Sequence, residues 1–405
     1  MTWVLQRRSI AFGVPCFFWG ELGKEFCSIS CQNGCQNGCR NECQNGSGKG
    51  RKMKFIHIAD VHLGAEPDAG KAYSKRRPEE LWESFVRVIS LCEREQIDLL
   101  LIAGDLFHRQ PLLRELKEVN ALFAKLTHTQ VVLIAGNHDY IRSDSYYLTF
   151  QWNENVHPLL GKNTQYVVLA QLDTAVYGFS YERREIPEAR YDGLQAQQKA
   201  EIEILLAHGG DEKHIPINRN MLRRSGFDYI AFGHIHKPQI VIKEMAAYAG
   251  ALEPIDKNDT GRHGFIRGEI KNGETHLSFV PFAKREYLHP VLQVEKTMTA
   301  RMVLDQIIET VQEYGEANLY KFILKGFRDP ELCFEREWSE IAGNILEIVD
   351  ETTPAYDFRK IYEENKNNLI GRFIRSFEGC TQESVEWQAL CEGIQALMES
   401  RGERG

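Results

Sequence analysis

The chain lacks any stretch that approaches the ~20 consecutive apolar residues of a transmembrane helix, so we expect no membrane-spanning segment. It also lacks a basic excess, because 49 Lys and Arg residues stand against 57 Asp and Glu residues and leave a formal net charge of −8. Domains that bind polyanions usually carry a basic excess, so any contact with nucleic acid must come from a local patch. The length of 405 residues leaves room for two or three domains.

Paired cysteines spread through the fold, which would indicate a secreted disulfide framework, are missing as well. Six of the ten cysteines lie before residue 50, and the other four are scattered over the rest of the chain. Scattered thiols are typical of proteins in a reducing compartment. We therefore predict a cytoplasmic location.

The first 52 residues do not have the pattern of a folded domain. Residues 31–46 repeat a cysteine about every four residues, whereas zinc sites typically pair two close ligands with a second pair further along the chain. Such a repeat is typical of low-complexity sequence without a packed core. A signal peptide is disfavoured, because charged residues interrupt the apolar stretch at Glu21, Lys24 and Glu25. We interpret residues 1–52 as an extension that is either disordered or upstream of a true start at Met53.

From Met53 onward the sequence alternates between strands and helices. Short apolar runs predict strands at 54–59, 98–103 and 131–135, and helical spacing of apolar residues predicts helices over 79–95 and 112–126. This β-α-β-α-β order with apolar strands indicates an α/β fold whose sheet is covered on both faces. More strands are predicted at 165–170, 174–179, 203–207 and 228–232, with strand-like segments from 239 to 282.

The character of the sequence changes after about residue 290. The pattern predicts a helix at 299–314, a strand at 319–326, and helices at 331–350 and 383–399. We therefore predict a main domain over residues 53–290 and a smaller α+β region with a helical tail over residues 297–405.

Five short motifs follow predicted strands and carry side chains that bind divalent metal ions. They are Asp60-Val61-His62, Gly104-Asp105, Gly136-Asn137-His138-Asp139, His208 and Gly233-His234-Ile235-His236. The carboxyl ends of strands in an open α/β sheet meet at one edge, where such folds place their ligands. One motif alone is more often a surface turn, which is how we interpret His57 and His214. Five motifs in order, each after a strand, predict a metal site.

Two metal ions would explain why these residue types recur. Hydrolysis of a phosphodiester needs a nucleophile near neutral pH and compensation of the charge on the phosphate oxygens, and a pair of divalent ions supplies both. A carboxylate placed between two strands can bridge such a pair, and Asp105 fits that role. The residues alone give the ligands but not their division between the ions.

At these motifs the sequence resembles the calcineurin-like metallophosphoesterases, whose pattern D-x-H, G-D, G-N-H-D/E, H and G-H-x-H is present in full. Residues 59–64, 104–108 and 233–237 look like the DNA-repair exonuclease branch, the SbcD/Mre-eleven-type nuclease subunits. The chain as a whole looks most like the bacterial YhaO-type subgroup. The resemblance implies a four-layer metallophosphoesterase β-sandwich flanked by helices, with residues 297–405 as a smaller cap and helical tail.

The resemblance also implies a role for each site residue. One manganese ion would be held by Asp60, His62, Asp105 and His236, and a second by Asp105, Asn137, His208 and His234. His138 would lie off the metals and stabilise or protonate the leaving oxygen. Asp139 would orient His138 through its ring N–H, and His108 would support the site.

The activity implied by the resemblance is a Mn²⁺-dependent DNA nuclease of repair type, an exonuclease that works with an SMC-like coiled-coil ATPase. The alternatives are a phosphoesterase for a small cyclic or dinucleotide phosphodiester and a weakly catalytic scaffold for the ATPase. The complete ligand set disfavours the scaffold, and the long region after residue 290 disfavours the small-molecule enzyme. A protein phosphatase is disfavoured because residues 104–107 read Gly-Asp-Leu-Phe instead of the start of GDxVDRG.

The sequence leaves the partner surfaces open. Basic clusters at residues 71–77, 183–184 and 219–224 could contact phosphates or could be solvated surface charge. The helical tail could dock the ATPase or pack on its own domain. A homodimer is also left open.

Overall fold

The computed structural model describes residues 52–71, 73–332, 334, 344–381 and 384–402. The predicted extension over residues 1–52 lies outside the described residues, apart from Lys52, and so does the middle of the helix predicted at 331–350. In the part of the chain that is described, no helix combines the length and the apolar character that crossing a bilayer demands.

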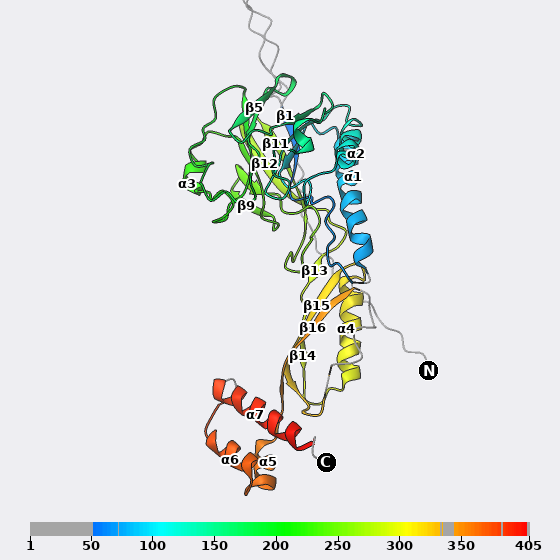
Figure 1. Ribbon diagram of the computed structural model, residues 1–405, viewed down its shortest axis with the longest axis vertical. Coiled ribbons are helices and arrows are strands. Elements are labelled where there is room, and N and C mark those ends of the chain that lie inside the picture. The colour runs from blue at the N-terminus through cyan, green and yellow to red at the C-terminus, as the bar shows by residue number, and fades with distance from the viewer. Residues whose placement is uncertain (1–51, 72, 333, 335–343, 382–383, 403–405) are drawn as a thin grey trace, which may run out of the picture. The chain divides into compact units, whose positions relative to one another are not determined.

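Two six-stranded mixed sheets form the main body of the protein (Figure 1). In the first sheet, four neighbouring strands are parallel, and a β-hairpin extends the sheet at one edge, with its inner strand antiparallel to the neighbouring parallel strand. Its order is β12 (Glu274–Pro281), β11 (Gly264–Lys271), β1 (Lys52–Ile58), β2 (Leu99–Ala103), β3 (Gln130–Ile134) and β4 (Val156–Pro158).

The second sheet has four parallel strands in its middle and an antiparallel strand at each edge. Its order is β5 (Gln165–Leu169), β6 (Thr174–Gly178), β7 (Ile202–His208), β8 (Tyr229–Gly233), β10 (Ala246–Tyr248) and β9 (Gln239–Ile242).

The two sheets pack face to face, because alternate side chains of each strand point to opposite faces. From β1, Phe55 lies in the apolar cluster between the sheets together with Ile204 of β7 and Tyr229 of β8. Ile56, on the opposite face of β1, packs instead among side chains of the outer helices. Burial on both faces explains why these strands have continuous apolar runs.

Helices cover the outer faces of the sandwich. On the first sheet lie α1 (Arg77–Glu95) and α2 (Leu113–Phe123), whose apolar stripes include Phe85 and Val119. The second sheet is covered by irregular segments and the short helix α3 (Arg219–Leu222). The short 3₁₀ turns are η1 (Ser74–Arg76), η2 (Tyr146–Leu148) and η3 (Ala170–Leu172). The expected helix-flanked β-sandwich is thus confirmed.

The C-terminal region has its own small sheet and helices. Strand β15 (Leu319–Arg328) pairs in parallel with its neighbours, and α4 (Ala300–Tyr314) packs on this sheet through Val303 and Ile307. The neighbours are β13 (Tyr287–Leu288), β14 (Val291–Val294) and β16 (Ile345–Pro354), and the tail contains α5 (Phe358–Asn365), α6 (Leu369–Ser376) and α7 (Val385–Gly402).

The structure contradicts two expectations from the sequence, one for residues 345–350 and one for His57. Residues 345–350 were expected to be helical but belong to β16, because β16 pairs with β15 and Glu347 forms an ion pair with Lys321 across the strands (3.5 Å). Short apolar runs do not distinguish strand from helix by periodicity alone. His57 is no surface residue either, because it is fully buried and its Nδ1 lies 2.8 Å from the Tyr229 hydroxyl.

A chain that begins at Met53 is expected to keep the fold. Within the described residues it loses only Lys52, whose ammonium pairs with Glu269 on the neighbouring strand (2.6 Å). Because the Lys52 side chain is 46% exposed, the pair is worth at most about 1 kcal/mol. Thermal unfolding of both chain lengths, followed by circular dichroism, should give nearly the same midpoint. A shorter chain without a cooperative transition or metal-dependent activity would show that the extension is needed.

Candidate metal centre

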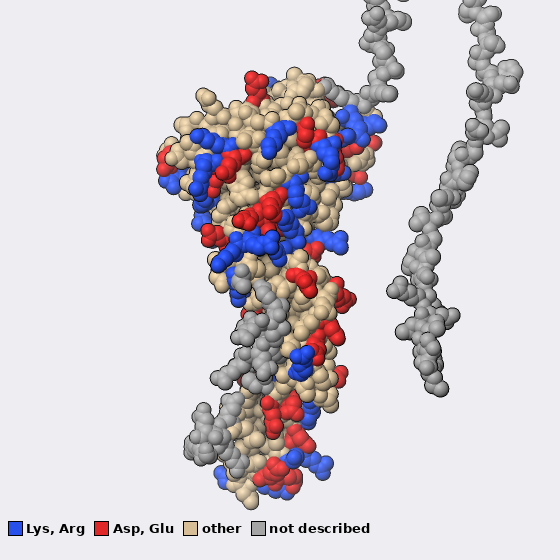
Figure 2. Space-filling view, turned by 90° about the vertical axis from the view of Figure 1, so that its right-hand side faces the viewer, with Lys and Arg blue, Asp and Glu red and all other residues tan. Residues whose placement is uncertain are grey.

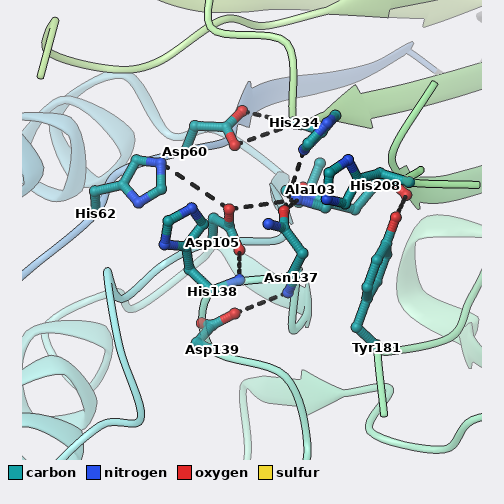
Figure 3. A network of polar contacts seen from close by, with 12 residues as sticks. Asp60, His62, Ala103, Asp105, Asn137, His138, Asp139, Tyr181, His208 and His234 are labelled. Atoms are coloured by element: carbon teal, nitrogen blue, oxygen red, sulfur yellow. Dashed lines mark hydrogen bonds and ion pairs between the residues drawn. The ribbon is translucent and has the colours of Figure 1, made fainter. Parts of the chain in front are cut away.

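The five sequence motifs lie just beyond β1, β2, β3, β7 and β8, and their side chains converge on one site (Figure 3). Four of the convergent residues have positive φ angles, namely Asp60 (49°), His62 (51°), Asp105 (49°) and His234 (95°). Positive φ angles are uncommon for residues other than glycine and occur mainly where the surrounding structure enforces them. The strained backbone turns these side chains toward one another.

Two glycines of the motifs allow the loops to approach this closely. Gly104 has a φ of +85°, and a Cβ atom there would collide with the ring of His208. A Cβ atom at Gly136 would collide with the carboxylate of Asp105. Both positions therefore need glycine for packing against a side chain of the site.

One group of ligand atoms comes from Asp60, His62 and His236, which all lie within 4.8 Å of one another. The Nε2 atoms of His62 and His236 are 3.1 Å apart. Both Asp60 and His62 are completely buried. Asp105 borders this group, since its Oδ2 lies 4.0 Å from Nε2 of His62.

A second group lies on the other side of Asp105. Nε2 of His208 is 3.5 Å from Oδ2 of Asp105 and 2.9 Å from Oδ1 of Asn137. The same Asn137 oxygen lies 3.1 Å from Nδ1 of His234. The structure thus brings all seven predicted ligands together, with Asp105 facing both groups. The Asp60 carboxylate of the first group also lies near the second, within 4.8 Å of the ligand atoms of Asp105 and His208.

Three of the four ligand histidines keep one ring nitrogen for the centre because the other ring nitrogen has a partner outside it. Nδ1 of His208 donates to the carbonyl of Ala103 (2.8 Å). Nε2 of His234 lies 2.7 Å from the carboxylate of Asp211, and Nδ1 of His236 lies 3.0 Å from that of Asp259. No motif in the sequence predicted either carboxylate.

Residues Asp211 and Asp259 have no strand-end motif. Asp211 could have been suspected because it lies three residues after the ligand His208. Nothing in the sequence around Asp259 indicates a role in the site. His214 is wrongly interpreted as a bystander on the sequence, because its Nδ1 lies 2.8 Å from Asp211 and its ring lies against that of His234 (4.3 Å between centroids).

The buried carboxylates dominate the electrostatics of the site. Burial raises the pKa of Asp60 to about 6. Burial also acts to raise the pKa of Asp105, but the imidazoles of His208 and His62 outweigh it and lower that pKa below its usual value. Burial acts in turn to lower the pKa of His208, yet the Asp105 carboxylate raises it to about 9.

The donor set fits two divalent metal ions. Asp60 and Asp105 are at most 1% exposed, and among the described residues no Lys or Arg forms an ion pair with either. Buried charges are normally paired or coordinate metals. Two carboxylates, one amide oxygen and four imidazoles are ligands that transition-metal ions accept.

His138 lies beside this donor set, on its exposed side. Its backbone N–H donates to Oδ1 of Asp105 (2.8 Å), and its Nδ1 donates to the carbonyl of His108 (3.1 Å). Its ring stacks on that of His108, with 4.8 Å between the centroids. Nδ1 of His108 in turn lies 3.3 Å from Nδ1 of His62. His108 therefore backs both His62 and His138.

The expected role of Asp139 is wrong in the described structure. Its carboxylate accepts hydrogen bonds from the backbone N–H groups of Gly136 (2.8 Å) and Phe107 (3.2 Å) and from the Tyr147 hydroxyl (2.9 Å). The carbonyl of His108, and not Asp139, holds the His138 ring. Asp139 is fully buried and ties together the loops that follow β2 and β3.

The comparison with protein families matches residues 53–238 to the family described as calcineurin-like phosphoesterase. The uncharacterized metallophosphoesterase YhaO of Bacillus subtilis is 29% identical in an alignment that covers 85% of this chain and 90% of that protein. The DNA double-strand break repair protein Mre11 of Archaeoglobus fulgidus is 28% identical over 54% of each chain. Mre11 of Aeropyrum pernix is 28% identical over 52% of this chain and 56% of that protein. The chain thus aligns with little more than half of these Mre11 proteins.

Proposed function

Residues 53–238 form a calcineurin-like phosphoesterase domain, and from that premise we propose that the chain is a two-metal nuclease that hydrolyses DNA. The observation that carries the proposal is the convergence of seven ligands, two of which are buried carboxylates that have no Lys or Arg partner among the described residues. A phosphoester hydrolase that depends on metal ions is the activity that the family and this donor set support.

Two divalent ions, for which we propose Mn²⁺, would supply a nucleophile near neutral pH and neutralise charge on the phosphate. Asp60, His62 and His236 would hold one ion, and Asn137, His208 and His234 the other, with Asp105 shared. The chain's own contribution is to place these groups before substrate arrives. The hydrogen bond from the His138 backbone fixes one oxygen of Asp105 and leaves the other free to face both groups.

His138 is the proposed proton donor. Because its Nδ1 donates to the His108 carbonyl, Nε2 is the nitrogen left for the substrate. A protonated Nε2 can donate its proton to the leaving oxygen as the phosphodiester breaks. His108 would hold the His138 ring, and Asp139 would support the loop that carries it.

Several features favour DNA as the substrate. The Mre11 relatives are described as DNA double-strand break repair proteins, and the motifs of this chain look like those of that branch. Figure 2 shows Lys and Arg side chains gathered over the part built from the two large sheets. The pKa of His108 is lowered by burial and by the His138 ring, and to a smaller extent by Arg184. Arg184 therefore lies close to the site, and because it is exposed its charge is free to contact a phosphate. Arg77, in contrast, cannot contact a phosphate, because it is completely buried and paired with Glu80.

A coiled-coil ATPase of the SMC type is the proposed partner, and the C-terminal helices are its proposed docking site. Leu369 of α6 and Val385 of α7 are 66% and 78% exposed. Covering these two side chains with a partner protein would remove apolar surface from water.

The substrate is tested with the full-length protein and Mn²⁺. We expect cleavage of labelled duplex or single-stranded DNA and little hydrolysis of cyclic nucleotides at matched concentration. DNA affinity should fall steeply with salt, because each Lys or Arg that contacts a phosphate releases a counterion. The Asp105→Ala protein, prepared in parallel, controls for contaminating nucleases. Efficient hydrolysis of a cyclic nucleotide with no action on DNA, even with the ATPase present, would replace the nuclease by a small-molecule phosphodiesterase.

A further inference from the structure

The two histidines of the last motif face the metal centre through different ring nitrogens. His234 turns Nδ1 toward Asn137 (3.1 Å), whereas His236 turns Nε2 toward His62 (3.1 Å). In each histidine, the ring nitrogen that points away from the centre contacts a carboxylate. Asp211 contacts Nε2 of His234, and Asp259 contacts Nδ1 of His236.

Backbone hydrogen bonds within its own loop fix the Asp211 carboxylate. Its Oδ1 accepts the backbone N–H groups of Lys213 (2.8 Å) and His214 (2.9 Å), and its Oδ2 lies 2.7 Å from Nε2 of His234 and 2.9 Å from Nδ1 of His214. The loop reaches this position through Gly209 and Gly210, whose φ angles are +131° and +129°. At Gly210 a side chain would also collide with the Tyr248 hydroxyl.

Asp259 is held in a similar way, in the loop between β10 and β11. Its Oδ2 accepts the backbone N–H groups of Ile255 (3.0 Å) and Asp256 (3.1 Å). The same loop is fixed from outside, because His289 donates to the carbonyl of Lys257 (2.9 Å). The Asp259 side chain is only 13% exposed, so water competes little for its contact with His236.

We propose that Asp211 and Asp259 are positioning residues, each of which governs the affinity of one of the two metal positions. Asp259 serves the position formed by Asp60, His62 and His236, and Asp211 serves the position formed by Asn137, His208 and His234. A carboxylate that accepts the outer N–H of a ligating imidazole fixes its tautomer and orientation and makes the inner nitrogen a better ligand. This inference rests on the proposed two-metal function.

The consequence is that one short motif supplies a ligand to each of the two metal positions. His234 and His236 are two positions apart, yet each is oriented by a carboxylate from a different loop and serves a different ion. A change at Asp211 should therefore weaken one ion and leave the other, and a change at Asp259 should do the reverse. A loss of such a partner typically costs about 10–100-fold in metal affinity.

The test is a Mn²⁺ titration of the metal-free, full-length protein and its Asp211→Asn and Asp259→Asn variants, by calorimetry and elemental analysis. Asparagine keeps an acceptor oxygen for the backbone N–H groups, so the loops should stay folded. In each variant we expect one affinity to fall about 10–100-fold and the other to stay within about threefold of the wild type. Matched controls are Glu212→Gln and Glu274→Gln, which change exposed carboxylates outside the site and should change neither affinity.

Pairing each change with a ligand variant assigns the positions. His208→Ala removes a ligand of the position that Asp211 serves. Adding Asp211→Asn should therefore change the remaining affinity little, whereas adding Asp259→Asn should weaken it about 10–100-fold. The reverse pattern, or equal weakening of both positions by one asparagine, would overturn the inference. So would unchanged affinities.

Two further measurements separate the possible failures. The metal-free variants should unfold within a few degrees of the metal-free wild type, and a large drop would mean that the carboxylates serve only folding. If the wild type binds two ions but does not cleave DNA, the proposed substrate is wrong while the positioning roles stand. If the wild type binds fewer than two ions, the proposed two-metal function itself fails.

Discussion

Replacing Asp105 with alanine should lower phosphodiesterase activity at least about 10³-fold, since even the loss of a single stabilising donor can cost that much. Asp105 faces both groups of ligands, with Oδ2 4.0 Å from His62 Nε2 and 3.5 Å from His208 Nε2. The substitution therefore removes a ligand from both metal positions. A chromogenic phosphodiester measures the activity, and elemental analysis after loading and desalting measures the metal content. The wild type should hold about two ions per chain.

Two variants separate a loss of ligand from a loss of structure. Asp105→Asn keeps an acceptor for the His138 backbone N–H, so it preserves the loop while it removes the charge. Asp305→Ala removes a carboxylate that is 47% exposed on α4 and should leave activity and metal content unchanged. A wild-type protein that retains one ion or none after loading would contradict the assignment of Asp105 as the shared ligand.

The layered fold could be predicted from the sequence because burial on both faces leaves a clear mark. The runs around Leu101 and Val132 are apolar without alternation, and each is a strand buried on both sides. The polar residues directly after these runs stand out against them. Because parallel strands end at the same edge, the order of the motifs was enough to predict that their side chains meet.

The parts that could not be predicted depend on contacts between distant loops. Asp259 reaches His236 only through the fold of an irregular loop, and no local pattern marks it. The positive φ angles of Asp60 and Asp105 are enforced by their surroundings and not by their own preferences. Asp139 follows His138 directly, yet the turn sends its carboxylate toward Phe107 and Gly136. The burial of His57 follows from Tyr229, 172 residues away.

The second large effect is expected at His138, where alanine should reduce turnover by about 10²–10⁴-fold, the range for loss of a general acid. Mn²⁺ affinity should stay nearly unchanged. Asp105 is fixed by the backbone N–H of residue 138, which the alanine variant keeps, and Nδ1 of the ring donates to the His108 carbonyl and so is not free to bind a metal ion. Single-turnover rates and Mn²⁺ titration on the same preparations measure the two quantities separately.

The identity of the leaving group sharpens the His138 experiment, because a general acid matters only when the departing oxygen needs a proton. A nitrophenolate leaves without one, so the His138→Ala variant should lose much less activity on a chromogenic ester than on a substrate with an alcohol leaving group, such as DNA. His128→Ala, which removes a histidine that is 44% exposed and pairs with Asp98, should lose activity on neither substrate. Equal losses on both substrates with normal metal content would mean that His138 stabilises charge on the phosphate without donating a proton. Loss of Mn²⁺ in parallel with activity would move His138 into the set of ligands.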